Sequence, residues 1–471
     1  MRTQQHAIVS VALLGLLLLA HPLGAAEPVD LAKRAEELKN LRFGMFICWS
    51  FSTFSEKEWT PGIKDVAFFN PTGCDTDQWA QTAKEAGMGY ILFLTKHHDG
   101  FCLWDTKTTD RKVTKSPLGK DVLAELRKSC DKHGIKLALY FSEGDWNWPG
   151  ATDGKGGAGG GGSLPEMKKA QLKELLGNYG PVEYTWFDHA IGDGGLGHKE
   201  TVEFCHQVQP GTLIGFNHGT AAGEVRLGEM GHPSPLSDPR GSGFNAEHTK
   251  GYTGYLLAEF TYPILPAHQG GAMWFYSLAK HDNLCYPAEK IYRDYVGAAK
   301  YGNIFSLDVG PDKAGRLRKI DVDTLRRVGE MIRAGASLPP PPVSLATGKP
   351  AKASSVWNAQ YGADKAFDGD DSTRWGAMPN SRAGWIEVDL GQDTLIGRAM
   401  IREVSFPRTR EYAIQYKDGD AWKELAKGTK IDSDKVIEFT PVKARYVRLN
   451  ILQAIEVPTI DEFEVYAPAG K

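Results

Sequence analysis

The chain has 471 residues, which is more than one hydrophobic core usually supports, so we expect at least two domains. Its formal net charge is only −3 and no basic run stands out, which argues against nucleic acid as a partner. Hydrophobic residues make up 41% of the chain, enough for well-packed cores, and the twelve Trp and seventeen Tyr residues include flat rings that suit stacking on sugars.

The first residues have the pattern of a secretory signal. Arg2 supplies a positive charge, residues 8–20 form a short apolar run, and residues 24–26 are small. The run is short for a membrane span. We therefore predict a signal peptide over residues 1–26, a secreted or periplasmic protein, and no membrane span after cleavage. The six Cys residues are scattered, which indicates neither a zinc site nor a disulfide framework.

Strands and helices are predicted to alternate after the signal. Apolar and β-branched runs indicate strands buried on both faces, and helical periodicity separates them. Strands are expected at residues 42–49, 90–94, 136–141, 184–187, 212–216, 258–262, 273–276 and 304–309, and helices at residues 79–86, 122–133, 167–176, 200–208, 288–300 and 322–334. About eight strands over roughly 300 residues favour a (β/α)8-like TIM barrel over residues 27–337, with an open doubly wound sheet as the alternative.

Two segments of unusual composition interrupt this pattern. Residues 154–163 are almost all Gly and predict a flexible loop, because no Lys-Ser or Lys-Thr pair follows to make a phosphate site. Four prolines at residues 339–342 predict a stiff linker over residues 338–343. Beyond it, alternating runs at residues 384–390, 399–402, 412–416 and 444–449 predict an antiparallel β-sandwich over residues 344–471.

Two predicted barrel strands end in groups that can do chemistry. Residues 184–187 run directly into Asp188, and the carboxyl ends of barrel strands are where such folds keep their active sites. A helix cap is the plainer role for that carboxylate. After the strand at 90–94 come His97, His98 and Asp99, which are costly to bury without a ligand. Paired imidazoles suit hydroxyl recognition, and a metal hydrolase centre is the competing interpretation, although adjacent His on a strand point in different directions.

Several of these segments together resemble one enzyme family. The matching segments are residues 43–47, Glu58-Trp59, residues 96–101, Leu103-Trp104, Trp186-Phe187-Asp188, residues 302–304 and residues 309–311. In this order they resemble the α-L-fucosidases of glycoside hydrolase family 29 over roughly residues 40–335. The resemblance implies a (β/α)8-like barrel and a retaining double displacement. It assigns Asp188 the role of the nucleophile that attacks the anomeric carbon.

A retaining site needs a second carboxyl group roughly 5 Å from the nucleophile, on the leaving-group side. The resemblance implies that this acid/base follows by some forty residues, in a pattern that ends in Glu. Residues 223–229 fit this pattern, and Glu229 follows Asp188 by 41 residues, so we predict Glu229 as the acid/base. Glu224 and Glu259 are the alternatives.

The resemblance also assigns substrate contacts, and the chain departs from the family at some of them. Hydroxyl recognition falls to His97, His98 and Glu58, with Trp59 stacked on the sugar. Cys48 stands where the family carries His, Asn217 lies where an Asp-Arg-Trp segment is expected, and Leu-Asp-Val at 307–309 replaces Leu-Asn-Ile. The predicted substrate-binding residues are Glu58, Trp59, His97, His98, Cys48, Asn217 and Glu259.

These departures alter the predicted sugar contacts and leave the two acids in place. We therefore expect hydrolysis of terminal α-L-fucosyl residues of an oligosaccharide or glycoconjugate, without a cofactor for catalysis. A related α-L-glycoside as substrate, or a catalytically silent glycan-binding protein, are the alternatives.

The C-terminal region resembles the discoidin, or coagulation factor C-type, carbohydrate-binding module. The matching residues are 366–370, 373–375, 385–391, 444–449 and 462–466. Many such modules hold one structural Ca2+, and the hard oxygens of Asp368, Asp371, Thr373 and Glu462 suit that ion. A plain Asp-Gly turn at 368–369 is the alternative.

Overall fold

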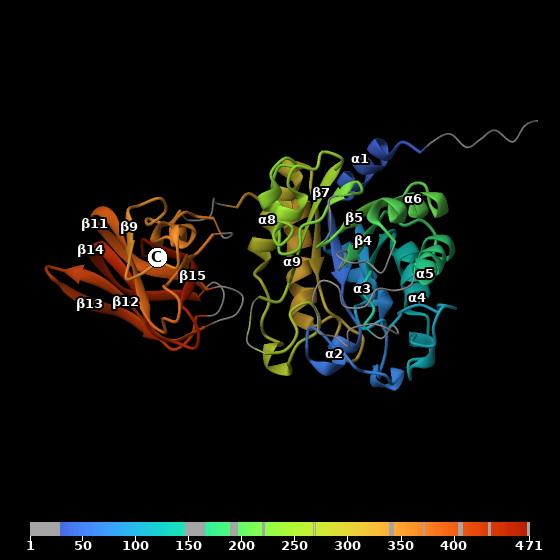
Figure 1. The fold of residues 1–471 in the computed structure, drawn as a ribbon, viewed down its shortest axis with the longest axis horizontal. Helices are drawn as coiled ribbons and strands as arrows, with labels where there is room; N and C mark the ends of the chain where they lie inside the picture. Colours follow the sequence, from blue (N-terminus) through green and yellow to red (C-terminus); the bar gives the residue numbers. More distant parts are fainter. Residues whose placement is uncertain are drawn as a thin grey trace, which may run out of the picture.

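The structure is a computed structural model that describes residues 29–146, 165–188, 196–218, 222–266, 268, 270–338, 343–370, 373–403, 408–431 and 435–468. The predicted signal peptide, the Gly-rich segment and the four linker prolines lie outside these residues. Among the described helices, none has the length and apolar character that a membrane crossing requires. The described residues form two bodies with separate hydrophobic cores (Figure 1).

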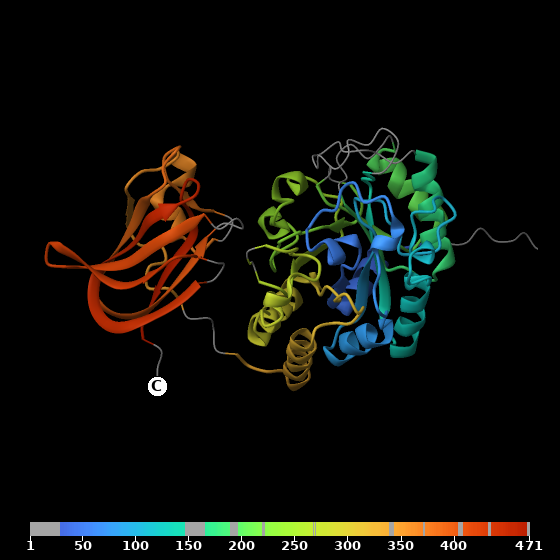
Figure 2. The ribbon, with the colours of Figure 1, turned by 90° about the horizontal axis from the view of Figure 1, so that it is seen from below.

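The first body is a nearly closed parallel barrel, which confirms the predicted fold class. In the described residues eight strands are arranged in the order β5-β4-β3-β2-β1-β8-β7-β6, so the first strand pairs with both the second and the eighth. Helices surround the strands (Figure 2). The strands are β1 (Phe43–Ile47), β2 (Tyr90–Lys96), β3 (Lys136–Ser142), β4 (Tyr184–Asp188), β5 (Leu213–Phe216), β6 (Val225–Arg226), β7 (Leu257–Pro263) and β8 (Ile304–Asp308).

The helices begin and end where local sequence signals place them. Helix α4 is the clearest case: the Asp121 side chain caps its first turn by accepting the amide of Ala124, and Gly134 ends it in the left-handed conformation. The bounds match the prediction for residues 122–133. The helices are α1 (Leu31–Leu41), α2 (Phe51–Ser55), α3 (Thr76–Glu85), α4 (Val122–His133), α5 (Pro165–Asn178), α6 (His198–Val208), α7 (Ala246–Thr249), α8 (Ala288–Tyr301) and α9 (Lys319–Ala334).

In the described part of the barrel, one predicted strand is wrong and one strand was not predicted. Residues 273–276 form an irregular loop after β7, and the unpredicted strand β6 is the sixth barrel strand in chain order, so the predicted strand at residues 258–262 becomes the seventh. At the seam between β5 and β6, the amide of Glu224 donates to the Ile214 carbonyl at 2.8 Å. The Glu224 side chain accepts the amide of Ile214 at 2.9 Å. The Glu224 carboxylate therefore accepts the Ile214 amide in place of a backbone carbonyl of a neighbouring strand.

Side chains inside the barrel are arranged in levels because alternate residues of each strand face inward. The hydroxyl of Ser306 contacts those of Tyr90 and Tyr184 at 2.7 and 2.9 Å. Two residues beyond Tyr184 on β4, the ring of Trp186 stacks on Tyr140 with centroids 5.3 Å apart. Two residues further along β4 is Asp188. The same alternation that buries the aromatic level thus delivers this carboxylate to the carboxyl end of the barrel.

The second body is the predicted antiparallel sandwich. Two long strands, β11 and β14, pair along most of their length, and register shifts after Asp389 and Ile396 bend the sheet over its own core. The predicted strands 384–390 and 399–402 are parts of one bent strand, β11. The strands are β9 (Ala351–Ala353), β10 (Trp375–Gly376), β11 (Gly384–Glu403), β12 (Thr409–Asp418), β13 (Ala421–Gly428), β14 (Lys435–Ala454) and β15 (Thr459–Tyr466).

The separate cores predict that the two bodies lose their structure in separate steps. Trp375 is fully buried in the sandwich core, so Trp375→Ala should lower the stability of the sandwich by about 3–5 kcal/mol. Differential scanning calorimetry should show one transition moving to lower temperature while the other stays in place. Trp357→Ala is the matched control, because that ring is 49% exposed. A shift of both transitions by Trp375→Ala would mean that the two cores unfold as one unit.

Candidate active site

Asp188 is held by polar groups from β3 and from the end of β5. Asp188 is the last residue of β4 and is only 8% exposed. The Tyr140 hydroxyl of β3 donates to Oδ2 at 2.5 Å, and Asn217, just after β5, donates from Nδ2 to Oδ1 at 2.7 Å. Such donors stabilise the ionised carboxylate and fix the direction of its oxygens. Both are properties that a nucleophile needs.

Glu229 lies next to Asp188, as the sequence predicts. Its backbone makes bridge contacts with Gly243 and Thr261, which place it beside β7. The same Asn217 Nδ2 that binds Asp188 also donates to Glu229 Oε2 at 2.9 Å. The two carboxylate oxygens therefore cannot be farther apart than these two distances combined, about 5.6 Å, close to the roughly 5–5.5 Å of retaining glycosidases.

The structure gives Asn217 protein partners on both sides of its amide. The residue is fully buried, its two N–H bonds face the two carboxylates, and its Oδ1 accepts a hydrogen bond from Nδ2 of Asn245. Because Asn245 must donate to that oxygen, the amide of Asn217 can only turn its NH2 group toward the acids. The predicted sugar contact is thus replaced by a link between the two acidic residues.

The two histidines follow β2 in a turn, so the expected divergence of adjacent strand residues does not apply. Their rings lie 4.0 Å apart. His98 contacts the Ser142 hydroxyl through Nδ1 at 2.7 Å, and its Nε2 lies 3.6 Å from Asp188 Oδ2. Asp99 accepts the Phe101 amide at 2.8 Å. Within the described residues, no set of three or more His, Cys, Asp or Glu side chains is arranged to hold a metal.

Glu58 and Trp59 lie on the loop that follows α2. Glu58 Oε2 accepts the amides of Met273 and Trp274 at 2.6 and 3.3 Å, so it orders the loop that was predicted as a strand. Burial raises the pKa of Glu58 to about 7, and the charge of Glu229 adds to this. The side chain can therefore be protonated near neutral pH and can donate as well as accept. Trp59 is 57% exposed, which leaves its ring accessible.

Cys48 lies at the end of β1 beside Asp308, the last residue of β8. Burial raises the pKa of the Cys48 thiol, and Asp308, which accepts its hydrogen bond, raises it further. Burial also raises the pKa of Asp308 well above its ordinary value. Both groups are buried, and Oδ1 of Asp308 accepts no hydrogen bond from the described part of the chain. A neutral thiol and a carboxyl group with a raised pKa thus occupy the positions where the sequence departs from the family pattern.

The two alternative acids, Glu224 and Glu259, accept hydrogen bonds from groups within the barrel. Glu224 belongs to the barrel seam, and His206 of α6 lies 3.7 Å from its carboxylate. Glu259 is buried inside the barrel on β7, where Oε2 accepts the amide of Gly228 at 3.3 Å and the indole N–H of Trp186 at 3.5 Å. Burial raises the pKa of Glu259 to about 8. Because it lies two residues before Thr261, which bridges to Glu229, it sits below the mouth and not at the predicted substrate surface.

Three residues of the site were not predicted from the sequence. Tyr140 could have been found, since it lies on a predicted strand with the alternation that faces the barrel interior. His218, whose Nε2 lies 2.8 Å from Glu229 Oε2, was visible only as a polar neighbour of Asn217. Asn245 precedes the short helix α7 and carries no sequence signal at all.

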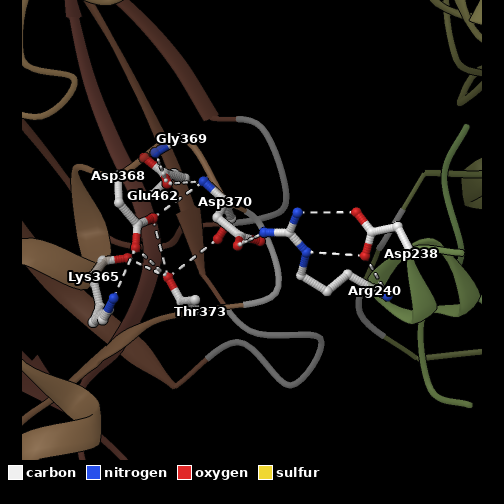
Figure 3. A network of polar contacts seen from close by, with 8 residues as sticks. All are labelled: Asp238, Arg240, Lys365, Asp368, Gly369, Asp370, Thr373 and Glu462. Carbon is white, nitrogen blue, oxygen red and sulfur yellow. Dashed lines mark hydrogen bonds and ion pairs between the residues drawn. The ribbon is translucent and has the colours of Figure 1, made fainter. Parts of the chain in front are cut away.

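A second cluster of polar groups lies in the sandwich (Figure 3). Thr373 donates to Asp368 Oδ2 at 2.8 Å, and Glu462 of β15 accepts the amides of Gly369 and Asp370 through Oε1 at 2.8 and 3.1 Å. Oε2 of Glu462 is buried and accepts no hydrogen bond from the described residues. Burial, with the nearby charges of Glu464 and Asp368, raises the pKa of Glu462 to about 8.

These groups fit a hard cation. Two carboxylates converge, and the carbonyl oxygens of Lys365 and Asp370 both lie 3.2 Å from the Thr373 hydroxyl. Carboxylate, hydroxyl and carbonyl oxygens are the donors that Ca2+ takes, and its charge would remove the cost of burying Glu462. Three of the four predicted ligands lie together, and the fourth, Asp371, is outside the described residues.

The same loop carries a contact between the two bodies. Arg240, next to Asp238 at the start of a short 3-10 turn in the barrel, binds that aspartate through Nε and Nη2 at 3.1 and 2.9 Å. Its Nη1 lies 3.7 Å from Asp370 Oδ2 of the sandwich (Figure 3). An exposed ion pair of this kind contributes little stability by itself. It does mark which faces of the two bodies meet.

The chain matches two known protein families along separate parts of its length. The family model described as α-L-fucosidase matches residues 25–336, and the model of the F5/8 type C domain matches residues 350–463. The chain belongs to the α-L-fucosidase family. It is 25% identical over 463 residues to Alpha-L-fucosidase 1 of Arabidopsis thaliana, covering 90% of this chain and 84% of that protein.

Solved structures of family 29 glycoside hydrolases share the fold. A fucosidase of Ruminococcus gnavus in complex with fucose is 23% identical, with a TM-score of 0.50, and the match covers 93% of this chain and 94% of that one. A family member from an unknown rumen bacterium is 22% identical, with a TM-score of 0.51, covering 94% and 78% of the two chains. The chain thus shares the fold of these hydrolases and carries an F5/8 type C domain after its α-L-fucosidase family region.

The seam role of Glu224 predicts a loss of stability without a loss of chemistry. Glu224→Ala leaves the buried amide of Ile214 without its acceptor, which should lower the free energy of unfolding by about 1–3 kcal/mol. Chemical denaturation should show this loss, while kcat on an α-L-fucoside stays close to that of the parent. Glu203→Ala, an exposed glutamate on α6, is the control and should change stability by less than about 0.5 kcal/mol. A collapse of kcat in the folded Glu224→Ala protein would return Glu224 to the list of candidate acids.

Proposed function

We propose that this chain is an exported, retaining α-L-fucosidase that removes terminal α-L-fucosyl residues from glycans. The observation that carries the proposal is the single amide of Asn217 shared by Asp188 and Glu229. It keeps one oxygen of each acid within about 5.6 Å of the other, a limit compatible with the roughly 5–5.5 Å of retaining glycosidases. Export rests on the signal-like residues 1–26. The F5/8 type C domain supports a glycan as the target of the whole chain.

In the first half of the reaction, a carboxylate oxygen of Asp188 attacks the anomeric carbon. The bond from that carbon to the leaving oxygen breaks, and Glu229 gives its proton to the departing alcohol. The nucleophile is already oriented, because Tyr140 and Asn217 each hold one of its oxygens. The product of this half is a fucosyl ester on Asp188.

In the second half, Glu229 works as a base. It takes a proton from a water molecule whose oxygen attacks the same carbon, and the ester bond to Asp188 breaks. Two inversions return the original configuration. His97, His98 and Glu58 supply hydroxyl-binding groups around this centre. Where the sequence departs from the family pattern, Cys48 supplies a neutral thiol and Asp308 a carboxyl group whose pKa is raised by burial.

Azide rescue tests both roles. On 4-nitrophenyl α-L-fucoside, we expect Asp188→Ala to lower kcat/KM, and Glu229→Ala to lower kcat, by at least about a hundredfold, because this leaving group needs the nucleophile but little protonation. With azide, Asp188→Ala should form the β-fucosyl azide by one inversion, and Glu229→Ala the α-fucosyl azide by two. Nuclear magnetic resonance of the products distinguishes these anomers.

A glutamate outside the pair is the control for this test. Glu259→Gln keeps the shape of a buried acid near the same strands and should form neither azide product in excess over the parent. Retained turnover in Asp188→Ala would contradict the retaining mechanism. So would a parent protein that binds fucosylated glycans but does not turn them over. The second outcome would favour a glycan-binding protein. If the parent protein cleaves another α-L-glycoside and no α-L-fucoside, the assignment of the sugar is wrong and the mechanism stands.

We also propose that Asp368, Asp371, Thr373 and Glu462 bind a structural Ca2+ in the sandwich. The support is the buried, unpartnered Oε2 of Glu462 beside Asp368. The ion would hold together the loop at residues 365–373 and β15, with no part in the hydrolysis.

Calcium removal should therefore act on stability. In excess EGTA the sandwich transition should fall, and adding Ca2+ should restore it in proportion to the logarithm of the free ion concentration. Glu462→Gln should abolish the response, whereas the control Asp364→Asn, on a carboxylate that is 70% exposed, should keep it. Equal transition temperatures in EGTA and in Ca2+ would contradict the proposal.

A further inference from the structure

His218 is the residue after Asn217, and it is the one imidazole among the described residues with an ion-pair contact to Glu229. Its Nε2 lies 2.8 Å from Glu229 Oε2, within hydrogen-bond distance. The His218 side chain is 32% exposed and that of Glu229 is 16% exposed, so the pair lies at the wall of the site and is partly shielded from water. The contact is made on the same oxygen that receives the Asn217 amide.

The backbone of His218 is held in an uncommon conformation. Its φ is 57°, in the left-handed region that residues with a Cβ seldom adopt. Oδ1 of Asn245 accepts its amide at 2.9 Å, and the same Asn245 binds the Asn217 side chain. One buried asparagine thus fixes both the amide that links the acids and the imidazole beside Glu229. Strain retained by surrounding contacts is a common feature of functional residues.

We infer that His218 and Glu229 form a dyad that carries the catalytic proton together, with His218 as a further catalytic residue of the hydrolysis. This inference rests on the function proposed above. The geometry lets His218 share the proton, because its Nε2 lies within hydrogen-bond distance of Glu229 Oε2. That oxygen either delivers the proton itself or shares its carboxyl carbon with the oxygen that does. The dyad adds nothing to nucleophilic attack, which remains with Asp188.

The proton balance of the dyad is simple. Before reaction the pair holds one proton, either on Glu229 or on the ring of His218. When the glycosidic bond breaks, the leaving oxygen takes this proton and the pair is left as neutral imidazole and carboxylate. In the second half, the water that attacks the fucosyl ester loses one proton to the pair, which restores the starting state. No other reactant is needed.

The charges around the dyad favour its protonated form. Burial alone would lower the pKa of His218, but the hydrogen bond to Glu229 and the charges of Asp188 and Glu229 outweigh it and raise the pKa to about 9. The titratable groups that face the pair from other elements are Asp188 on β4, Glu58 after α2, Glu259 on β7 and Tyr140 on β3. The pair should therefore keep its proton through neutral pH and lose it, with the activity, as pH rises through about 9.

Leaving-group dependence tests the dyad. His218→Asn is the first variant, since Asn tolerates the left-handed backbone but is too short to reach Glu229; His218→Gln is the second. On 4-nitrophenyl α-L-fucoside, whose leaving group needs little protonation, kcat/KM should change less than about threefold. On a methyl or phenyl α-L-fucoside, which needs the proton, kcat/KM should fall by tenfold or more, and the alkaline limb of its pH profile should move down by at least about one unit.

His206→Gln is the matched control, because His206 also faces a glutamate, Glu224, but lies at the barrel seam. His206→Gln should leave kcat/KM on both substrates, and the alkaline limb of the pH profile, unchanged. Equal losses on good and poor leaving groups in the His218 variants, or an unmoved alkaline limb, would overturn the dyad and leave a purely structural imidazole. Those outcomes differ from failure of the proposed function, in which the parent protein itself shows no fucoside turnover or no azide products from the Asp188 and Glu229 variants.

Discussion

The two acids at the barrel mouth depend on one buried amide. Two carboxylates brought to within about 5.6 Å repel each other, and each costs free energy when it leaves water. The NH2 group of Asn217 offers a donor to each without adding a charge that would neutralise them. Its orientation depends in turn on Asn245, which donates to the opposite side of the amide. The separation of the acids is therefore set by a side chain that itself performs no bond-breaking step.

The surroundings of the acids differ, and this difference separates their roles. Asp188 is bound by the Tyr140 hydroxyl and the Asn217 amide, which favour its ionised form. Glu229 shares an oxygen with His218, a group that can hold a proton. Around them, Glu58, Asp308 and Glu259 have pKa values raised chiefly by burial, so the wall of the site can present neutral acids without adding further negative charge. The sandwich meets the barrel through Asp370 of its polar loop, opposite Arg240.

In the barrel, the sequence predicted the strands that carry strong signals and missed β6, which does not. β4 and α4 were found because a buried run and an Asp–Gly capped helix are local features. β6 has two residues, too few to show an alternating pattern, and its place in the barrel depends on Glu224 at the seam. Residues 273–276 look like a strand because they are apolar. In the structure their aromatic rings pack near the mouth of the barrel. The ring centroids of Trp274 and Phe46 lie 6.1 Å apart, and those of Phe275 and His97 lie 5.1 Å apart.

By itself the sequence determined the family and the barrel followed by a sandwich, and it predicted that two acids 41 residues apart come together. These follow from motifs and periodicities, which are written locally along the chain. Only the tertiary structure decided that Asn217 joins the acids, that Glu259 lies inside the barrel and that His218 pairs with Glu229. Such contacts depend on which strands become neighbours and on how each side chain turns, and neither is encoded in the spacing of residues.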